Sequence, residues 1–484
     1  MPVTAEPKPV IGQDTSVENN LGLVHACAHR FKGRGIEYDD LFQAGCMGLV
    51  KASAAFDAGR GVMFSTYAVP VILGEIRRLF RDGGTVKVSR SLKELALRAT
   101  REREGYIHRE GREPTIGELA DQTPKLKLAA SHTDWPCLKL KPSPEVTSGR
   151  YGKLNTEVYG GPLLHTWFDR PLSMAGKVCV TSDAPAGTKT IFVDFKRPVL
   201  TIPNLAIHMN REANQGVAVN PQVDMLPLLT LIKSDLEKED FFLKALAAEA
   251  GVEKQDILDY EIYVYNTENG TLCGLDGEFY SAPRLDNLTS VQACLSGIMN
   301  STAGNEIHVI ALYDNEEIGS STKQGAASLL MDRVLEKLFL SLGCSREAYL
   351  NALFDGFMLS LDVAHAIHPN HSEKCDIKNQ ILMGDGVAIK LSASQSYATD
   401  ATSTGMIESI CRNAKIPYRK FSNRSDMKGG STLGSISSSY LTMRTVDAGI
   451  PMLAMHSARE VMGTADQKAL VDLVTAYFNK TNMD

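Results

Sequence analysis

The pattern of apolar residues changes at about Lys125, and this change requires two unlike kinds of domain in one chain. Upstream, residues 21–31 and 40–56 carry apolar side chains at the three-to-four-residue spacing of helices. Downstream, short apolar strands alternate with helices and glycine-rich turns, a pattern typical of an α/β fold. Because 484 residues exceed one ordinary domain, we expect two or three domains.

The first 120 residues also differ from the rest in charge. The whole chain has a net charge of −6, but residues 1–120 contain 17 Lys and Arg against 15 Asp and Glu. Within residues 74–103 there are nine basic and four acidic residues, a local charge of +5. This positive charge favours a polyanionic partner, although a solvated helix face explains the charge equally well.

Two aromatic residues, Phe64 and Tyr67, lie just upstream of the basic residues. Aromatic rings beside a positive groove can stack on unpaired bases and hold them. The predicted DNA-binding residues are Phe64, Tyr67, Arg77, Arg78 and Arg81. Their spacing by itself favours the other interpretation, in which both aromatic rings belong to a helical core.

Three segments of this part carry a resemblance to a known family: YDDLFQAGCMGLVKA, FSTYAVPVILGEIRRLFRD and VKVSRSLKEL. They resemble region 2 of bacterial sigma factors of the sporulation and stress-response type, over about residues 15–120. The resemblance implies an all-α domain in which residues 40–56 dock on the RNA polymerase core and the FSTYA segment helps to open −10 promoter DNA. No later segment resembles the family's helix-turn-helix, so we do not expect this chain to initiate transcription alone.

Four apolar strands in the second part each end at ionisable side chains. KLKLAAS ends at His132, and FMLSL ends at Asp362. IHVIALYDN ends at Glu316 and Glu317, and PMLAM ends at His456. Since sites in open α/β sheets are built at the carboxyl ends of strands, we expect these side chains to share one site.

The residue types at these strand ends suit zinc, which binds histidine nitrogen and carboxylate oxygen. Asp286 lies in a polar loop after Pro283 and is a candidate to bridge two ions, which would clamp the attacking and leaving oxygens. Glu316 and Glu317 are adjacent, so one can bind metal while the other takes a proton from water. An exposed turn is the alternative for such a pair, but the apolar strand before it favours the site.

A second resemblance is carried by eight ordered segments: SHTDWPCLKLKP, KLNTEVYGGPLLHTWFDRPLSMAG, PRLDNL, DNEEIGSSTKQGA, DVAHAIHPNH, QSYATDATSTG, DMKGGSTLGSI and TVDAGIPMLAMHSARE. From about residue 128 to about 478, the chain resembles the aspartyl aminopeptidase family of dizinc metallopeptidases. A departure from the family is Trp135, at a position where a small residue is usual. Its indole would crowd the pocket beside the metal ligand.

The resemblance implies two zinc ions per subunit. One ion would be held by His132 and Asp362, and the other by Glu317 and His456. Asp286 would bridge the two ions. This ligand set is what the family implies, and it agrees with the residue types at the strand ends.

The same resemblance implies roles for residues around the ions. Glu316 would be the general base, and Asp134 would orient His132 from behind. Lys390 resembles the position that meets an acidic side chain of the substrate's first residue, and His165 resembles a histidine near the substrate.

The family's architecture gives the expected fold class and domains. We expect an α/β metallopeptidase domain, residues 121–154 and 281–484, with an inserted β-rich domain, residues 155–280, that forms a lid and oligomer contacts. An all-α sigma region 2 domain, residues 1–120, precedes it. Family members assemble as dodecamers, so a homo-oligomer is expected.

The junction at about residues 105–128 falls inside both families. The peptidase part begins almost at His132, without the N-terminal helix and edge strands of the family. We therefore expect an exposed sheet edge and weaker packing. A fusion by deletion, or an error that joined two genes, explains such a junction better than a two-domain regulator does.

The predicted function is a zinc-dependent aminopeptidase that removes N-terminal residues, acidic ones by preference, from peptides. The alternative is a protein that binds RNA polymerase core and −10 promoter DNA through residues 15–120 and carries an inert peptidase remnant. The sequence shows no apolar leader and no apolar run of membrane-spanning length, so no membrane partner is expected. Nine cysteines without a CxxC pair favour the reducing cytoplasm.

Overall fold

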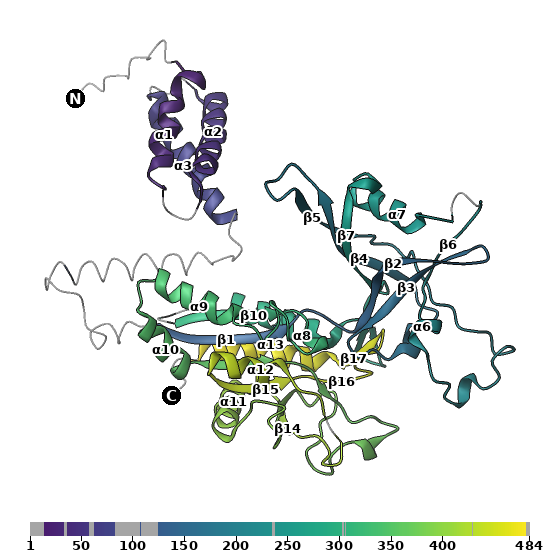
Figure 1. The fold of residues 1–484 in the computed structure, drawn as a ribbon. Coiled ribbons are helices and arrows are strands. Elements are labelled where there is room, and N and C mark those ends of the chain that lie inside the picture. The colour runs from purple at the N-terminus through teal and green to yellow at the C-terminus, as the bar shows by residue number, and fades with distance from the viewer. Residues whose placement is uncertain are drawn as a thin grey trace. The chain divides into compact units, whose positions relative to one another are not determined.

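The computed structural model describes residues 14–32, 36–57, 62–82, 107, 124–234, 238–302, 304, 306–427 and 429–480. The chain divides into two compact units, Met1–Leu95 and Ala96–Asp484 (Figure 1). The predicted boundary at residue 120 and most of the junction at 105–128 lie outside the described residues, as does the side chain of Arg81.

The described residues of the first unit form helices and no strand, as the helical spacing predicts. A short 3₁₀ turn, η1 (Glu18–Asn20), leads into three helices: α1 (Leu21–His29), α2 (Tyr38–Ala55) and α3 (Phe64–Asp82). Leu49 of α2 and Ile72 of α3 are fully buried between the helices. A Cβ atom at Gly48 would lie 2.7 Å from the Cα of Ile72, so glycine allows the two helices to pack closely.

The second unit contains a six-stranded central sheet in the order β10-β1-β11-β15-β13-β14. Its strands are β1 (Lys125–His132), β10 (Glu306–Tyr313), β11 (Phe357–Leu361), β13 (Val387–Lys390), β14 (Tyr418–Phe421) and β15 (Arg444–Gly449). β1 runs parallel to both β10 and β11, and β11 runs parallel to β15, whereas β13 is antiparallel to β15. The carboxyl ends of β10, β1 and β11 therefore meet at one edge of the sheet.

Helices cover both faces of this sheet. They are α8 (Leu285–Met299), α9 (Leu330–Ser341), α10 (Arg346–Asp355), α11 (Ala401–Ala414), α12 (Leu433–Leu441) and α13 (Thr464–Asn479). Leu359 of β11 belongs to a buried cluster with Tyr477 of α13 and Ala293 of α8. The neighbouring Ser360 faces Gly434 of α12. Because side chains alternate along a strand, α12 lies on the face opposite α8 and α13.

A second six-stranded sheet is antiparallel, in the order β5-β4-β7-β2-β3-β6. Its strands are β2 (Cys137–Ser148), β3 (Tyr151–Tyr159), β4 (Leu172–Thr181), β5 (Thr188–Asp194), β6 (Leu228–Leu231) and β7 (Ile257–Asn266). Helix α7 (Phe241–Ala250) contributes Phe242 and Leu246 to its core, and α6 (Pro221–Asp224) lies in a connecting segment. The sheet begins at Cys137, upstream of the expected domain boundary at residue 155.

The PMLAM segment does not join the central sheet. It forms β16 (Pro451–Leu453) in a small sheet with the order β12-β16-β17-β9-β8. The other strands are β8 (Thr271–Cys273), β9 (Phe279–Ala282), β12 (Ala364–His365) and β17 (Glu460–Gly463). The argument that His456 follows a strand of the same sheet as His132 is therefore wrong: β15 ends at Gly449, and after Ile450 the chain enters β16, which belongs to the small sheet.

Strand β10 pairs with β1 and, among the described residues, with no strand on its other side. β10 is thus an edge strand within these ranges, and the expectation that missing strands expose this edge stays a prediction. Weaker packing at this edge stays a prediction. None of the described helices combines the length and apolar character needed to cross a bilayer.

Candidate metal centre

The central sheet brings the first two predicted ligands together. His132 is the last residue of β1, and Asp362 directly follows β11. The two strands are parallel neighbours with Ala130 opposite Ser360, so both side chains leave the sheet at the same edge. The peptide N–H of Asp362 donates to the carbonyl of Ala448, which extends the pairing with β15 to the ligand itself.

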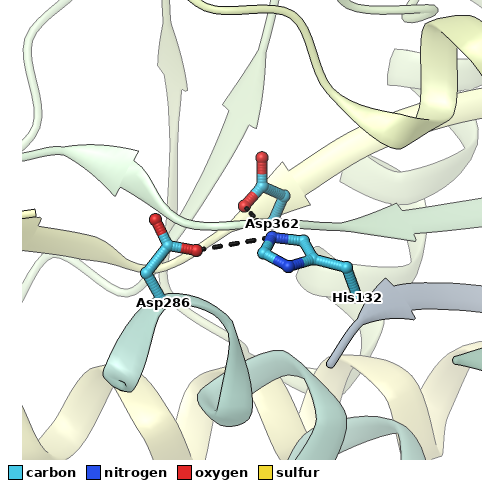
Figure 2. A group of neighbouring side chains, drawn as sticks. All are labelled: His132, Asp286 and Asp362. Carbon is cyan, nitrogen blue, oxygen red and sulfur yellow. Dashed lines mark ion pairs between the residues drawn. The ribbon is translucent and has the colours of Figure 1, made fainter. Parts of the chain in front are cut away.

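Asp286 completes a first group of donors. The Nε2 atom of His132 lies 3.4 Å from Oδ1 of Asp286 and 3.6 Å from Oδ1 of Asp362 (Figure 2). Asp286 is only 4% exposed and lies in the first turn of α8, where its backbone is not helical. The expectation of a polar loop is wrong, because Leu285 and Asn287 beside it are buried and the amide of Asn287 donates to the carbonyl of Leu361.

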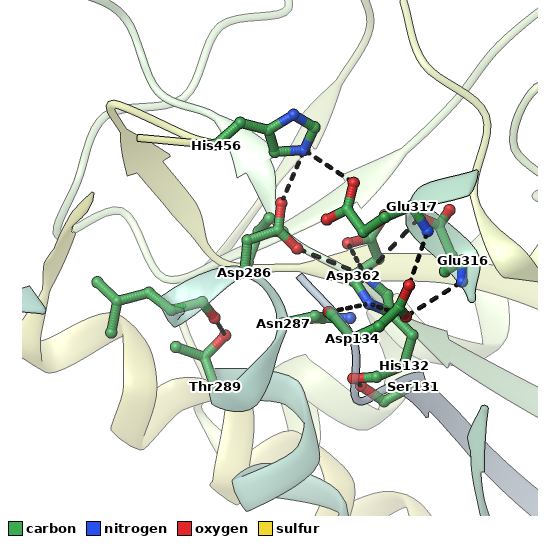
Figure 3. Close-up of polar contacts among 12 residues, drawn as sticks. Ser131, His132, Asp134, Asp286, Asn287, Thr289, Glu316, Glu317, Asp362 and His456 are labelled. Atoms are coloured by element: carbon green, nitrogen blue, oxygen red, sulfur yellow. Dashed lines mark hydrogen bonds and ion pairs between the residues drawn. The ribbon is translucent and has the colours of Figure 1, made fainter. Parts of the chain in front are cut away.

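Asp286 also belongs to a second group. The Nε2 atom of His456 lies 3.4 Å from Oδ2 of Asp286 and 3.4 Å from Oε2 of Glu317 (Figure 3). Glu317 lies in η7 (Glu316–Ile318), a 3₁₀ turn two residues after the end of β10. The two oxygens of Asp286 therefore face two different histidines.

Both histidines present Nε2 to the carboxylates because Nδ1 has a backbone partner. Nδ1 of His132 lies 3.0 Å from the carbonyl oxygen of Asp134, and Nδ1 of His456 lies 3.1 Å from that of Gly161. When Nδ1–H donates to a carbonyl, the lone pair of Nε2 points at the carboxylates. This tautomer is the one that a metal-binding histidine needs.

The carboxylate of Asp134 connects the two segments that carry His132 and the glutamates. It lies 3.3 Å from Nδ1 of His132. It also accepts the peptide N–H groups of Glu316, at 3.1 Å, and Glu317, at 3.2 Å. The hydroxyl of Tyr159 donates to the same carboxylate at 2.8 Å. Asp134 is thus placed to orient His132 and to fix the turn that bears both glutamates.

Burial and the mutual proximity of charges shift the pKa values of these groups. Burial alone would lower the pKa of His132, but the carboxylates of Asp134 and Asp286, with Asp362, outweigh it and raise that pKa well above its usual value. Burial, reinforced by the charge of Asp286, raises the pKa of Glu317 to about 9.

The pKa of Glu316 moves to an intermediate position. Burial raises it, and the negative charge of Asp362 raises it further, to about 7. The carboxylate of Glu316 has one oxygen 4.0 Å from Nε2 of His132. A buried carboxyl group that gains and loses a proton near neutral pH, beside candidate metal ligands, is suited to proton transfer.

The donor atoms of these residues fit a metal ion. The described residues form three groups whose ligand atoms lie within 4.8 Å of one another: His132, Asp286 and Asp362; His132, Glu316 and Glu317; Asp286, Glu317 and His456. Oδ1 of Asp286 and Oε1 of Glu317 are buried and accept no hydrogen bond from the described residues. Buried carboxylate oxygens without a donor are costly, and cations relieve that cost.

The two predicted substrate residues lie in different environments. Lys390 is 2% exposed, and its ammonium group donates to Oδ2 of Asp362 at 3.3 Å and to the carbonyl of Val363 at 2.9 Å. His165 is exposed on η3 (Leu164–Trp167). That turn is held near His456, because the N–H of Leu163 donates to the carbonyl of His456.

In the helical unit, the predicted DNA-binding residues are not equivalent. Phe64 is 3% exposed and packs edge-on against Phe56, with ring centroids 5.2 Å apart, so its ring is part of the helical core. Tyr67 is half-buried, whereas Arg77 and Arg78 are exposed on α3. Their contact with DNA stays a prediction.

Sequence reasoning missed the residues that support the ligands. Glu460 is buried and accepts hydrogen bonds from the peptide N–H groups of Asp286 and His456. Asn315 donates from its amide to the hydroxyl of Tyr159, which in turn holds Asp134. Glu460 follows His456 by four residues in the HSARE segment, and this short spacing was the one available signal.

Comparison with known proteins agrees with this geometry. The model of the family described as aminopeptidase I zinc metalloprotease (M18) matches residues 106–478, most of the chain. The chain belongs to the M18 family. It is therefore a member of a family of metallopeptidases. A second model, sigma-70 region 2, matches residues 17–85.

Two clostridial relatives are both described as probable M18 family aminopeptidase 2. The probable M18 family aminopeptidase 2 of Clostridium novyi (strain NT) is 46% identical over 354 residues, covering 73% of this chain and 82% of that protein. The Clostridium acetobutylicum protein of the same name is 46% identical over 366 residues, covering 75% of this chain and 84% of that protein.

Solved structures of M18 enzymes share the fold. The chain matches Ape4, in its cryo-EM complex with Nbr1, with a TM-score of 0.70 and 33% identity, over 74% of this chain and 72% of Ape4. It matches the crystal structure of prApe1 with a TM-score of 0.67 and 28% identity, over 74% and 79% of the two chains. An M18 aminopeptidase from Thermotoga maritima, 21% identical with a TM-score of 0.66, shows the same fold.

Proposed function

We propose that this M18 family member is a dizinc aminopeptidase, with one zinc ion held by His132 and Asp362 and the other by Glu317 and His456. The observation that carries the proposal is the carboxylate of Asp286. Each of its oxygens lies 3.4 Å from the Nε2 atom of a different histidine. A carboxylate between two donor groups is the arrangement that a bridging ligand requires.

Zinc held by these residues would supply Lewis acidity and would lower the pKa of a bound water. The chain itself supplies proton transfer through Glu316, whose pKa of about 7, raised by burial and by Asp362, is suited to a general base. Glu316 would take the proton of the attacking water and return it to the nitrogen of the leaving peptide. Asp134 holds the peptide N–H of Glu316 and so fixes the turn that carries the base.

We propose acidic residues as the preferred N-terminal residues of the substrate, with Lys390 as the recognising cation. Its ammonium group has three N–H donors, two of which contact Asp362 and Val363. Among the described residues the third meets no oxygen acceptor, although Nζ lies 5.1 Å from the centroid of the Tyr397 ring, and it would donate to a substrate carboxylate. His165 would line the approach, because η3 adjoins the turn that bears His456.

The role of Glu316 is tested by Glu316→Gln in the full chain. We expect two zinc ions per chain, as in the wild type, and a loss of turnover of about a thousandfold or more on aspartyl and glutamyl substrates, because the amide cannot accept the proton. Glu347→Gln, an exposed change on α10, is the matched control and should leave both zinc content and turnover unchanged. Retained turnover in Glu316→Gln would exclude this residue as the base.

The second sheet is the proposed lid and oligomer contact. It is a separate antiparallel layer with its own core around Phe242 and Leu246, attached to the candidate metal centre through β3, which ends at Tyr159. One of the similar structures is that of the S. cerevisiae mApe1 dodecamer. A homo-oligomer is therefore proposed for this chain as well, and size-exclusion chromatography with light scattering tests it.

A second candidate function concerns residues 17–85, which match sigma-70 region 2. This helical unit has its own buried core and presents Arg77 and Arg78 on the surface of α3. We propose that it binds RNA polymerase core and −10 promoter DNA. Pull-down of core polymerase by the full chain tests the first contact. Binding of an unpaired −10 oligonucleotide, with Arg77→Glu as the altered variant, tests the second.

A further inference from the structure

Glu460 is a buried carboxylate whose two oxygens contact two candidate metal ligands through their backbones. Glu460 is 2% exposed. Oε2 accepts the peptide N–H of Asp286 at 3.0 Å, and Oε1 accepts the peptide N–H of His456 at 2.7 Å. One side chain therefore joins a segment 174 residues away to the turn four residues before it.

The two segments need such a support because neither ligand lies within a strand. His456 has a φ of 66°, in the left-handed region that side chains other than glycine rarely adopt. Arg284, two residues before Asp286, has a φ of 63°. Backbones in this region persist only where neighbouring contacts hold them. Glu460 accepts the N–H of each ligand directly.

Glu460 is itself well fixed. It is the first residue of β17, where it pairs with Ala282 of β9, just before the segment that carries Asp286. β17 also pairs with β16, which leads to His456. The small sheet thus holds the carboxylate between the two chain segments that it joins.

A carboxylate is a costly choice at this position. It is buried close to the carboxylate of Asp286, and negative charges repel one another in a desolvated site. A carboxylate nevertheless has two equivalent acceptor oxygens and can receive two N–H groups at once, whereas an amide side chain has one oxygen. The demand for two acceptors explains why a charged group is present.

We propose that Glu460 is a positioning residue for the metal centre: it fixes the backbones of Asp286 and His456 so that their side chains can share one ion. This inference rests on the proposed dizinc function. Groups that orient metal ligands from behind typically change metal affinity by about 10- to 100-fold when they are altered.

The chain offers a matched control in Asp466. This carboxylate is fully buried at the start of α13 and also accepts two peptide N–H groups, from Gly384 and Gly386, each at 2.8 Å. Asp466→Asn therefore removes one acceptor from a buried pair, as Glu460→Gln does, at a position that holds no candidate ligand.

The experiment measures Zn²⁺ affinity by chelator competition and the visible absorption of the Co²⁺-loaded full chain. We expect Glu460→Gln to weaken binding of one ion by about 10- to 100-fold and to change the Co²⁺ spectrum. Asp466→Asn should keep the wild-type affinity and spectrum even where it lowers the unfolding temperature. Wild-type metal binding in Glu460→Gln, or equal losses in both variants, would overturn the inference.

Two further measurements separate a failure of this inference from a failure to fold and from a failure of the proposed function. If circular dichroism shows that Glu460→Gln does not fold, Glu460→Asp is measured, because its shorter carboxylate retains charge but does not reach both N–H groups. Wild-type affinity and spectrum in Glu460→Asp would then overturn the inference. Failure of the wild-type chain to bind two ions would overturn the proposed function itself, which separates the two failures.

Discussion

The two halves of the candidate metal centre are built differently. The strand-borne half, His132 and Asp362, follows two neighbouring parallel strands, and the side chain of His132 is 1% exposed. The loop-borne half, Glu317 and His456, lies on turns after β10 and β16, and the side chain of His456 is 33% exposed. Asp286 contacts one histidine of each half.

The difference shows two ways in which a chain can place a ligand. A ligand at the end of a paired strand is held by the hydrogen-bond ladder of the sheet, which many residues share. A ligand on a turn depends on single acceptors, here Asp134 for Glu317, the carbonyl of Gly161 for His456, and Glu460. The strand-borne half should therefore be tied to folding, and the loop-borne half to a few replaceable contacts.

The largest expected effect is on stability without metal. His132→Ala removes a cationic partner of buried Asp286 and of partly buried Asp362 and should lower the free energy of unfolding by about 3 kcal/mol. His456→Ala, at a partly exposed turn, should lower it by less than about 1 kcal/mol. Chelator-treated thermal and urea unfolding measures both. Equal losses of unfolding free energy in the two variants would contradict the idea that the strand-borne half is tied more closely to folding.

The second prediction concerns pH. Burial alone would lower the pKa of His456, but the carboxylates of Asp286 and Glu317 raise it to about 9, and burial with Asp286 raises that of Glu317 to about 9. An ion in the loop-borne half must therefore compete with protons on both His456 and Glu317 at pH 7. In the strand-borne half, His132 has a raised pKa, whereas Lys390 and His132 outweigh burial and lower that of Asp362, so one proton is displaced.

Metal binding that releases protons weakens as pH falls, by about tenfold per pH unit for each proton. We expect the affinity for the strand-borne ion to fall about tenfold per pH unit on acidification below pH 7, and the affinity for the loop-borne ion to fall more steeply. Chelator competition at several pH values, resolved into two binding steps, gives both slopes. Identical slopes would show that the two halves titrate as one.

Sequence reasoning found the strand-borne half for a physical reason. β1, after its first residue, and β11 are buried throughout, so their apolar residues form continuous runs whose ends can be located. The two strands are parallel, which brings those ends to one edge of the sheet. The helical unit was also predictable, because its apolar residues repeat at helical spacing. The M18 ligand set itself came from resemblance.

The rest depends on contacts between distant residues. Asp286 looks like a loop residue locally, and only the packing of α8 against β11 shows that it is buried. The same holds for Glu460, whose partner is 174 residues away. In helix α9, Leu335 and Phe339 are buried whereas the equally apolar Leu330 is 53% exposed, because the neighbouring helices decide which face turns inward.

The smallest expected effect is that of Asp134→Asn on the affinities for the two ions. Asp134→Asn keeps one side-chain oxygen and so weakens the acceptor of the N–H groups of Glu316 and Glu317. His132 retains its 3.0 Å contact with the backbone carbonyl of residue 134, which the substitution does not change. We therefore expect about a tenfold loss of affinity for the loop-borne ion and a smaller loss for the strand-borne ion.

The two binding steps of a chelator titration measure these losses, with Asp466→Asn as the control for a buried carboxylate elsewhere. A larger loss at the strand-borne step would mean that Asp134 acts mainly through the ring of His132. The main contact of Asp134 would then be the one between its Oδ1 atom and Nδ1 of His132, at 3.3 Å, and not its hydrogen bonds to the backbone of Glu316 and Glu317. The predicted order of losses instead makes Asp134 a support of the turn first and of the histidine second.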